Sequence, residues 1–576
     1  MRVRDGHRLD QDWLLPPSMD EWLTPDHLAR AVSQAVAGLD LTGVETTYHQ
    51  SGPGAPPYDP ALVLRVLIYG YLTQRLSSRR MAQACREDLP MMWLARGLQP
   101  RHTVLAAFRA QHADQIPRWM AQVVMACTAA GWVGWQLGAV DGSKIQANAS
   151  KHKAMSYARM KALVPQLEAE IAALVATHGA RDAADRPVPP DRLARLRQRL
   201  TQVQAAMRAL EAAEAEAPAG GSPAAPPSTT ARAGQPAGDP AAAPRSEAPP
   251  AADPEPSASV PPDAAQYNFT DPESAIMTTK TRGVQQAYNA QILVDARAGV
   301  IVGYTVSAHA TDVTELVPTL DAAVGDRLPA QIVADAGYWS ATNLTALSAR
   351  GRDGYIAAGA AADALGPNDR VRKAHLRYDA TTDTYTCPAD QAIPYRRTRT
   401  ATLGGQAVAV RVYRTDAATC AGCAWAARCL AAGRRTRTVE RYPDDATRDA
   451  MVAKLRTDAG AAIYRRRKGI VEPVWGILKQ ALGFRQFGRR GLTRVTEEFG
   501  WLVLAYNVRK LARGVPLSAP PPAAGPSASP ERAVSYGARH SACPRCLRRG
   551  GVGQPRRPDP SRGAVLPRAL RRLCAA

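Results

Sequence analysis

The stretch AQILVDARAGVIVGYTV at residues 290–306 decides the fold class. Its two runs of β-branched and other apolar residues, separated by an Ala-Gly pair, are typical of a β-hairpin. The chain then continues with an expected helix at 315–324, a buried strand at 331–339 and a helix at 340–351 that begins with Ser340 as its cap. Strands that alternate with helices predict an α/β domain.

A further strand is expected upstream, in WQLGAVDGSKIQANAS at 135–150. Its apolar positions lead to Asp141 and Gly142, which suits a strand that ends in a turn at this pair. The residues before it read as helices, and Asp59 followed by Pro60 supplies an N-cap and a first-turn proline. These helices fit a DNA-recognition arrangement and a plain helical bundle equally well.

Composition divides the rest of the chain. The stretch at 214–262 has no Phe, Trp or Tyr, and such a segment cannot bury enough apolar surface to fold. The residues from 515 onward carry 11 Arg against two acids and are also expected to be disordered. The expected segments are a helical DNA-binding domain at 1–135, a first core strand at 136–156, a helical hairpin at 157–213, a disordered linker at 214–262, the catalytic core at 263–351, a Cys-containing β-rich insert at 352–445, core helices at 446–514 and a basic tail at 515–576.

The net charge of +22 at pH 7 points to a polyanionic partner. Each phosphate that Lys or Arg neutralises releases condensed counterions, so strongly basic proteins bind nucleic acids. A general compositional bias toward Arg would also raise the charge. The distribution favours nucleic acid, because residues 456–510 carry 12 Lys or Arg against 4 Asp or Glu.

Membrane-spanning and secreted classes are not expected. No run of 18 or more apolar residues is present, and the first residues, MRVRDGHRLDQDWLLPP, hold no apolar stretch of signal-peptide length. Nine cysteines in such a chain read as thiols or metal ligands rather than disulfides. We expect a cytoplasmic protein.

Three carboxylates stand out by their context. Asp141 follows an apolar run, and Asp335 ends the expected strand at 331–339, each before small residues; Glu472 follows a basic cluster. A carboxylate at a strand end beside small residues can hold a hard cation. Three of them can bind the two Mg²⁺ ions used for in-line phosphoryl transfer. Each one alone also fits a turn residue or a solvated carboxylate.

Four blocks of the sequence resemble, in order, the core of bacterial insertion-sequence transposases with a DDE catalytic triad. They are AVDGSKIQANAS, DPESAIMTTKTRGVQQAYNAQILVD, VADAGYWSATNL and YRRRKGIVEPVWGILKQALGFRQFGRRGL, and the resemblance covers most of residues 15–514. Glu472 and Lys479 show that family's E-x6-K spacing, with Tyr464 upstream. The gap from Arg467 to Glu472 is one residue longer than in the best-known form of the signature. The Arg role therefore stays open between Arg466, Arg467 and Lys468.

The resemblance implies a ribonuclease-H-like mixed sheet with flanking helices and a triad of Asp141, Asp335 and Glu472. It implies that the triad holds two Mg²⁺ ions, for which Mn²⁺ can substitute, during DNA strand cleavage and strand transfer. The implied partners are double-stranded DNA, as terminal inverted repeats and target, bound by a homodimer in a synaptic complex at the nucleoid. A metal-dependent nuclease that cuts without joining and an inactive DNA-binding remnant are the alternatives.

The basic residues around Glu472 are expected to contact DNA. Glu472 and Lys479 are seven apart and so share one helix face, where the carboxylate can bind metal while the ammonium reaches a phosphate. A surface lysine is the plainer interpretation. Contacts to phosphates fix the register of DNA without reading its sequence. The expected DNA-binding residues are Tyr464, Arg466, Arg467, Lys468, Lys479, Arg489 and Arg490.

The insert carries four cysteines that suggest a second metal site. Two thiols in C-x2-C spacing, Cys420 and Cys423, can clamp Zn²⁺ tetrahedrally, and two more thiols close the site. The insert resembles one that lies between the second Asp and the Glu in relatives of the family. A structural zinc and a set of reduced thiols both fit. The proposed zinc ligands are Cys387, Cys420, Cys423 and Cys429. In the tail, Cys543 and Cys546 have no second pair nearby.

Two further features are expected to be structural. His309 and Asp312 fall where the family has a polar turn, and a helix N-cap at Asp312 or a neighbour is preferred over a catalytic role. Trp339 and Trp475 flank the proposed metal residues. Packing in the core is preferred for both over stacking on a base.

Overall fold

The computed structural model describes residues 18–47, 56–181, 190–216, 260–279, 283–357, 370–403 and 406–512. All of them belong to the first of two units, Met1–Ser518, into which the chain divides. Most of the predicted linker, at 217–259, lies outside the described residues, and so does the predicted tail with Cys543 and Cys546. No helix in the described part of the chain is long and apolar enough to cross a membrane.

Helices make up the described chain before the first strand. The Asp59 carboxylate accepts a hydrogen bond from the Ala61 N–H at 2.8 Å, and Pro60 is the first helical residue, as predicted. The helix that they start is buried over most of its length. The helices are α1 (Leu28–Ala37), α2 (Thr42–Glu45), α3 (Pro60–Leu72), α4 (Ser78–Glu87), α5 (Leu89–Leu94), α6 (His102–Gln111) and α7 (Ile116–Ala129), with a 3-10 turn at Ala113–Gln115.

A six-stranded mixed sheet follows, in the order β4-β5-β1-β7-β8, with β6 also paired to β5. Its strands are β1 (Leu137–Gln146), β4 (Ala275–Thr279), β5 (Gly283–Asp295), β6 (Ile301–Ser307), β7 (Gln331–Ala334) and β8 (Asp353–Ile356). β1 is antiparallel to β5 and parallel to β7, which is parallel to β8. The predicted hairpin is β5–β6, and the prediction of an α/β fold is confirmed. β8 belongs to this sheet, whereas the residues from 352 onward were predicted to belong to the insert.

The first core strand is longer than predicted. The expectation that it ends at Asp141 and Gly142 was wrong, because β1 continues to Gln146. Its antiparallel pairing with β5 runs without interruption from Gly138 opposite Asp295 to Gln146 opposite Ala287. The long partner strand satisfies the backbone of the residues after Asp141 and keeps them extended. Asp141 therefore lies within the strand.

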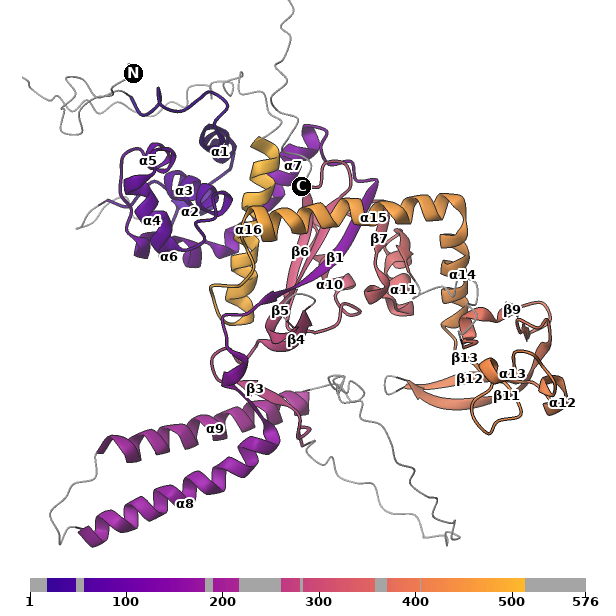
Figure 1. Ribbon diagram of the computed structural model, residues 1–576. Helices are drawn as coiled ribbons and strands as arrows, with labels where there is room; N and C mark the ends of the chain where they lie inside the picture. The colour runs from indigo at the N-terminus through magenta and orange to yellow at the C-terminus, as the bar shows by residue number, and fades with distance from the viewer. Residues whose placement is uncertain are drawn as a thin grey trace, which may run out of the picture. The chain divides into compact units, whose positions relative to one another are not determined.

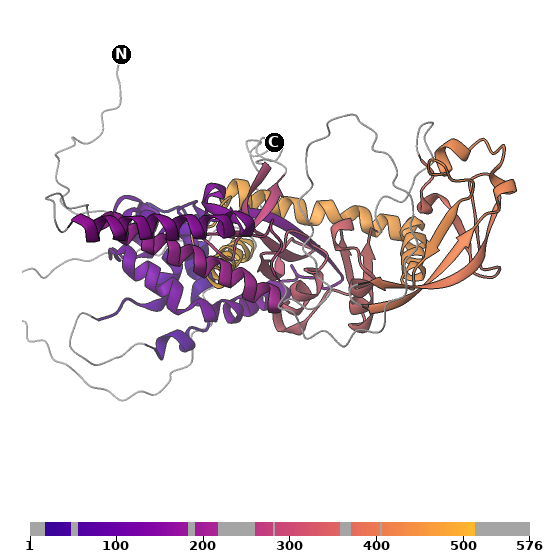
Figure 2. The ribbon, with the colours of Figure 1, turned by 90° about the horizontal axis from the view of Figure 1, so that it is seen from below.

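Helices cover the sheet and connect it to the N-terminal helices. α15 runs along one face, against β1, β5, β7 and β8 (Figures 1 and 2). α16 packs on β6 and also on α1, α3 and α7, so the helices and the sheet share one apolar core. Ser340 caps α11 as predicted, accepting from the Asn343 N–H at 3.0 Å. These helices are α10 (Leu316–Asp321), α11 (Ala341–Ala349), α14 (Asp445–Arg456), α15 (Asp458–Gly476) and α16 (Leu492–Ala512), with 3-10 turns at Val324–Asp326 and Ala336–Tyr338 and a π-helical segment at Ile477–Ala481.

Two smaller parts have cores of their own. The helical hairpin packs through Met160, Val203 and Ala206, and the insert packs through Tyr385 and Ile393. The hairpin consists of a 3-10 turn at Lys151–Lys153, β2 (Ala154–Ser156), α8 (Tyr157–Arg181), α9 (Pro190–Glu216) and β3 (Gln266–Asn268). The insert consists of a 3-10 turn at Lys373–His375, β9 (Arg377–Asp379), β10 (Thr384–Thr386), β11 (Ala392–Leu403), β12 (Gln406–Arg414), α12 (Ala417–Cys420), α13 (Ala426–Cys429) and β13 (Thr438–Arg441). Its five strands form an antiparallel sheet in the order β13-β12-β11-β10-β9.

Candidate active site

Asp141 lies on β1 in a place where ionisation is unfavourable. Its backbone pairs with Ile292 of β5, and its side chain is 20% exposed. Burial raises the pKa of Asp141 to about 6; the Asp335 carboxylate raises it as well, Arg467 lowers it, and Asp312 raises it. A carboxyl group whose pKa is raised by burial and by neighbouring carboxylates is typical of a functional site.

Asp335 directly follows β7 and starts a 3-10 turn. Its Oδ1 accepts a hydrogen bond from the Gly337 N–H at 2.8 Å, which fixes the carboxylate at the end of the strand. β1 and β7 are adjacent parallel strands with Ala139 paired to Val333, so Asp141 and Asp335 each follow this pair by two residues. The Asp335 carboxylate accordingly raises the pKa of Asp141. Two of the three predicted carboxylates therefore come together.

Glu472 lies on α15, the helix that crosses β1 and β7, and its side chain is exposed to solvent. The residue of this helix that approaches Asp141 is Arg467, with Nη1 at 3.8 Å from Oδ1. Within the described ranges, no group of three or more His, Cys, Asp or Glu side chains is arranged to hold a metal ion. Glu472 thus lies on the helix that crosses the strands of the two aspartates, and it does not form a ready-made metal site with them among the described residues.

Asp312 is a carboxylate near Asp141 that was not predicted to belong to the site. Its Oδ1 accepts hydrogen bonds from Asn289 at 2.7 Å and from Gln291 at 3.0 Å. The prediction of a helix N-cap at Asp312 or a neighbour was wrong, because the N-cap residue of α10 is Glu315 and no side chain caps this helix. The sequence does contain a signal for this contact: the polar residues Asn289 and Gln291 are two apart in an apolar strand and so share one face of it.

Lys479 faces β1. α15 ends at Gly476, and the π-helical segment that follows interrupts the regular spacing between Glu472 and Lys479. The Lys479 ammonium donates to Ser143 Oγ and lies 5.2 Å from the ring centre of Trp475. Burial lowers the pKa of Lys479, and the Asp141 carboxylate opposes that change. Segments of π-helix inside α-helices are frequent at functional sites.

The basic cluster before Glu472 divides into inner and outer residues. Arg467 is turned toward Asp141, whereas Arg466 and Lys468 are exposed. Burial raises the pKa of Tyr464, and the adjacent Arg467 lowers it, so these two side chains lie together near the carboxylates. Of the three candidates Arg466, Arg467 and Lys468, Arg467 is thus the one that approaches Asp141.

Two arginines that follow Lys479 in the sequence make contacts within the protein. Arg489 forms an ion pair with Glu497 at 2.6 Å, and Arg490 donates to the carbonyl of Asn148 at 2.9 Å. Arg490 is exposed, whereas Arg489 is half-buried.

Both tryptophans pack in the core, as predicted. Trp475 is 6% exposed and stacks on Phe499 with ring centres 6.1 Å apart. Trp339 is partly buried and packs against the main apolar core.

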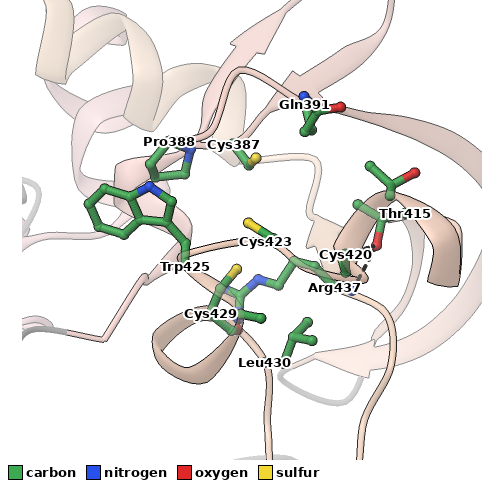
Figure 3. A pocket seen from close by; sticks show the side chains of 12 residues that line it. Cys387, Pro388, Gln391, Thr415, Cys420, Cys423, Trp425, Cys429, Leu430 and Arg437 are labelled. Carbon is green, nitrogen blue, oxygen red and sulfur yellow. Dashed lines mark hydrogen bonds between the residues drawn. The ribbon is translucent and has the colours of Figure 1, made fainter.

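The four cysteines of the insert line one pocket, together with Trp425 and other residues (Figure 3). Cys387 follows β10, and the other three lie on or beside α12 and α13. Burial raises the pKa of Cys429; Arg437 lowers it, and the three other thiols raise it. Cys420 Sγ lies 3.2 Å from Thr415 Oγ1. The cysteines in the described part of the chain are free thiols, and these four are gathered at one place.

Comparison with known proteins gives two family matches. Residues 386–512 match the model of a transposase DDE domain, and residues 17–111 match that of a transposase domain, DUF772. The first match includes Glu472 and Lys479, and the second spans α1 to α6, whereas Asp141 and Asp335 lie outside both. No match was found among curated proteins or among solved structures.

Proposed function

We propose that this chain, whose two domain matches indicate an insertion-sequence transposase of the DDE type, cuts DNA at transposon ends and joins it to target DNA. The matches support a transposase in general, with DNA as its substrate and chemistry of the polynucleotidyl-transferase type. The main support for cutting and joining is that Asp141 and Asp335 occupy matching positions on the adjacent parallel strands β1 and β7 and their continuation. Such a pair suits metal-dependent phosphoryl transfer.

We assign the central sheet to the ribonuclease-H-like class. In support, β1 lies between an antiparallel β5 and a parallel β7, with β6 and β8 beyond them, and α15 covers one face. This order brings the end of β7 beside β1, where the two aspartates lie. The third proposed carboxylate, Glu472, is on the covering helix.

DDE transposases use divalent metal ions, and Asp141, Asp335 and Glu472 are the residues proposed to hold two Mg²⁺ ions here. When bound, such ions activate the attacking hydroxyl group and stabilise the leaving oxygen. Burial and the neighbouring carboxylates raise the pKa of Asp141, and a divalent cation bound there would offset both effects. Arg467 orients the Asp141 carboxylate, and Lys479 brings a positive charge to the same strand.

DNA binding is proposed for the surface around α15. Arg466 and Lys468 are exposed beside Glu472, where they can contact phosphates. Of the seven residues predicted to bind DNA, Arg466 and Lys468 form this outer group and Arg467 and Lys479 the inner pair. The other three are Tyr464, Arg489 and Arg490. We also propose a homodimer, since two transposon ends must be held together for joining.

A structural zinc ion is proposed for the insert. The four cysteines line one pocket, and they are not arranged as a ready-made metal site. Thiolates are ligands that Zn²⁺ prefers, and the thiols would become ligands by losing their protons. The mutual influence of these thiols on the pKa of Cys429 supports the grouping. Bound zinc would hold α12 and α13 against the end of β10.

A strand-transfer assay tests the proposed function. The substrates are a duplex that carries the inverted repeat flanking the gene, the same duplex already cut at its 3′ end, and a supercoiled plasmid as target. We expect cleavage of the first and joining of the second in Mg²⁺. Cleavage without joined product would support a nuclease, and binding with neither reaction would support an inactive remnant. Either result would overturn the proposal.

A further inference from the structure

Asp312 lies between the two segments that carry Asp141 and Asp335. A Cβ atom added at Gly337 would lie 2.9 Å from Asp335 Oδ1 and 3.3 Å from Asp312 Oδ2, so the two carboxylates flank one backbone position. A Cβ atom added at Gly142, next to Asp141, would lie 2.8 Å from Asp312 Oδ1. The two glycines therefore provide the space in which Asp312 approaches both segments.

Two buried amides fix the Asp312 carboxylate. Asn289 and Gln291 are 0% exposed, and both donate to Oδ1 of Asp312, at 2.7 and 3.0 Å. Asn289 Oδ1 is itself buried without a hydrogen-bond partner among the described residues. An unpaired buried acceptor is unfavourable, so the amide keeps this orientation because of its bond to Asp312. Oδ1 is thus occupied by protein donors, while Oδ2 is the oxygen near Gly337 and Asp335.

The loop that carries Asp312 is also tied to the turn after Asp335. Asn343 Nδ2 donates to the carbonyl of Val313 at 2.8 Å and to that of Tyr338 at 2.7 Å. The Tyr338 hydroxyl donates to Gln291 Oε1. Buried polar networks whose members bond to one another hold their parts in one arrangement. This network connects β5, the Asp312 loop and the Asp335 turn.

We propose that Asp312 is a positioning residue of the metal site. It holds the Asp335 turn at a fixed place relative to β1, and its negative charge strengthens the binding of divalent cations by Asp141 and Asp335. The inference rests on the proposed function, since it concerns the same site. A capping role does not account for Asp312, because α10 has no side-chain cap.

Calorimetric titration of the full chain with Mn²⁺ tests the inference. Asp312→Asn keeps the size of the side chain and an oxygen that can accept from both amides, but it removes the charge. We expect the dissociation constant for Mn²⁺ to rise about tenfold, because one negative charge near the bound cation is removed. DNA binding and the melting temperature should stay close to those of the wild type. The matched control is Asp321→Asn on α10, whose carboxylate is exposed and paired with Arg350 at 2.6 Å, and which should bind Mn²⁺ normally.

Two further variants make the outcome decisive. Asp312→Glu keeps the charge and should retain most of the Mn²⁺ affinity; equal losses in Asp312→Glu and Asp312→Asn would overturn the inference, because packing alone would then explain them. Unchanged affinity in Asp312→Asn would overturn it as well. Asp141→Asn distinguishes a failure of the proposed function from a failure of the role of Asp312. If it binds Mn²⁺ like the wild type, the proposed function fails, whereas if it loses Mn²⁺ and Asp312→Asn does not, only the role of Asp312 fails.

Discussion

The Arg467 guanidinium lies 3.8 Å from the Asp141 carboxylate, Nη1 to Oδ1, with 14% and 20% of the two side chains exposed. Arg467 belongs to α15 and Asp141 to β1, so the pair joins the helix that carries Glu472 to the strand that carries the first aspartate. Its positive charge lowers the pKa of Asp141, against burial and Asp335, which raise it. Arg467 therefore offsets part of the repulsion among the carboxylates.

Replacing Arg467 should change the pH dependence of DNA cleavage. Without the guanidinium the pKa of Asp141 rises, so the carboxyl group ionises only at higher pH. In Arg467→Gln we expect the acid limb of the plot of cleavage rate against pH to shift to higher pH by roughly one unit. The control is Arg466→Gln, which changes an exposed neighbour and should leave the limb in place. Identical profiles for both variants would contradict the role of Arg467.

Asp141→Asn should stabilise the protein at neutral pH. The folded-state pKa of Asp141 is raised from 3.8 to about 6, so the ionised carboxylate costs stability above that pH. The cost is absent below about pH 4 and grows as the pH rises toward 6. Each pKa unit corresponds to about 1.4 kcal/mol, which gives an expected gain of about 1–3 kcal/mol at pH 7.5.

Urea unfolding of wild type and Asp141→Asn at pH 7.5 and at pH 4 measures this difference. The gain should be present at pH 7.5 and nearly absent at pH 4. A gain of the same size at both values would show that packing, rather than ionisation, is responsible. Asp321→Asn, which changes an exposed carboxylate, should show no gain at either pH.

Gly142→Ala should impair catalysis while the protein still folds and binds DNA. The new Cβ would lie 2.4 Å from Gln291 Nε2 and 2.8 Å from Asp312 Oδ1, so these groups must move. Small misplacements of catalytic groups can cost about 100-fold in rate, and we expect a loss of that order in single-turnover cleavage. Gly469→Ala on α15, where a Cβ would meet nothing within 4 Å, is the control. Equal rates for the two variants would contradict this account.

Cys423→Ser should remove zinc from the insert. We expect about one zinc ion per chain in the wild type, measured by elemental analysis after purification, and a strong decrease in the variant. Its melting temperature should also fall, because the metal connects three short elements of the insert. Cys85→Ser, which changes a buried thiol of α4, should keep its zinc. Wild-type protein without zinc after growth in zinc-supplemented medium would refute the proposal.

Local signals in the sequence predicted much of the fold. The apolar runs around Gly299 gave the β5–β6 hairpin, and the caps at Asp59 and Ser340 marked two helix starts. Each of these depends on residues that are close together in the chain. The strand before Asp335 was predicted for the same reason, but the expectation that it runs to 339 was wrong, because β7 ends at Ala334 and a 3-10 turn follows.

Features that depend on distant residues were not predictable. Asp312 reaches the site through Asn289 and Gln291, which are more than 20 residues away in the sequence. β1 continues past Asp141 because β5 is long enough to pair with it. The π-helical segment changes the relation of Lys479 to Glu472, since its hydrogen bonds follow from packing rather than from spacing. Register and helix irregularity are tertiary effects that a single sequence does not reveal.

We propose that Asp141, Asp335 and Glu472 act together in DNA cleavage. The most direct measurement is single-turnover cleavage of a transposon-end duplex in Mg²⁺ by Asp141→Asn, Asp335→Asn and Glu472→Gln, with DNA affinity measured in parallel. We expect each variant to bind DNA like the wild type and to lose at least ~10³-fold in rate, roughly 4 kcal/mol of transition-state stabilisation. A rate within tenfold of wild type in any of the three would contradict the claim for that residue, and for Glu472 would remove it from the triad.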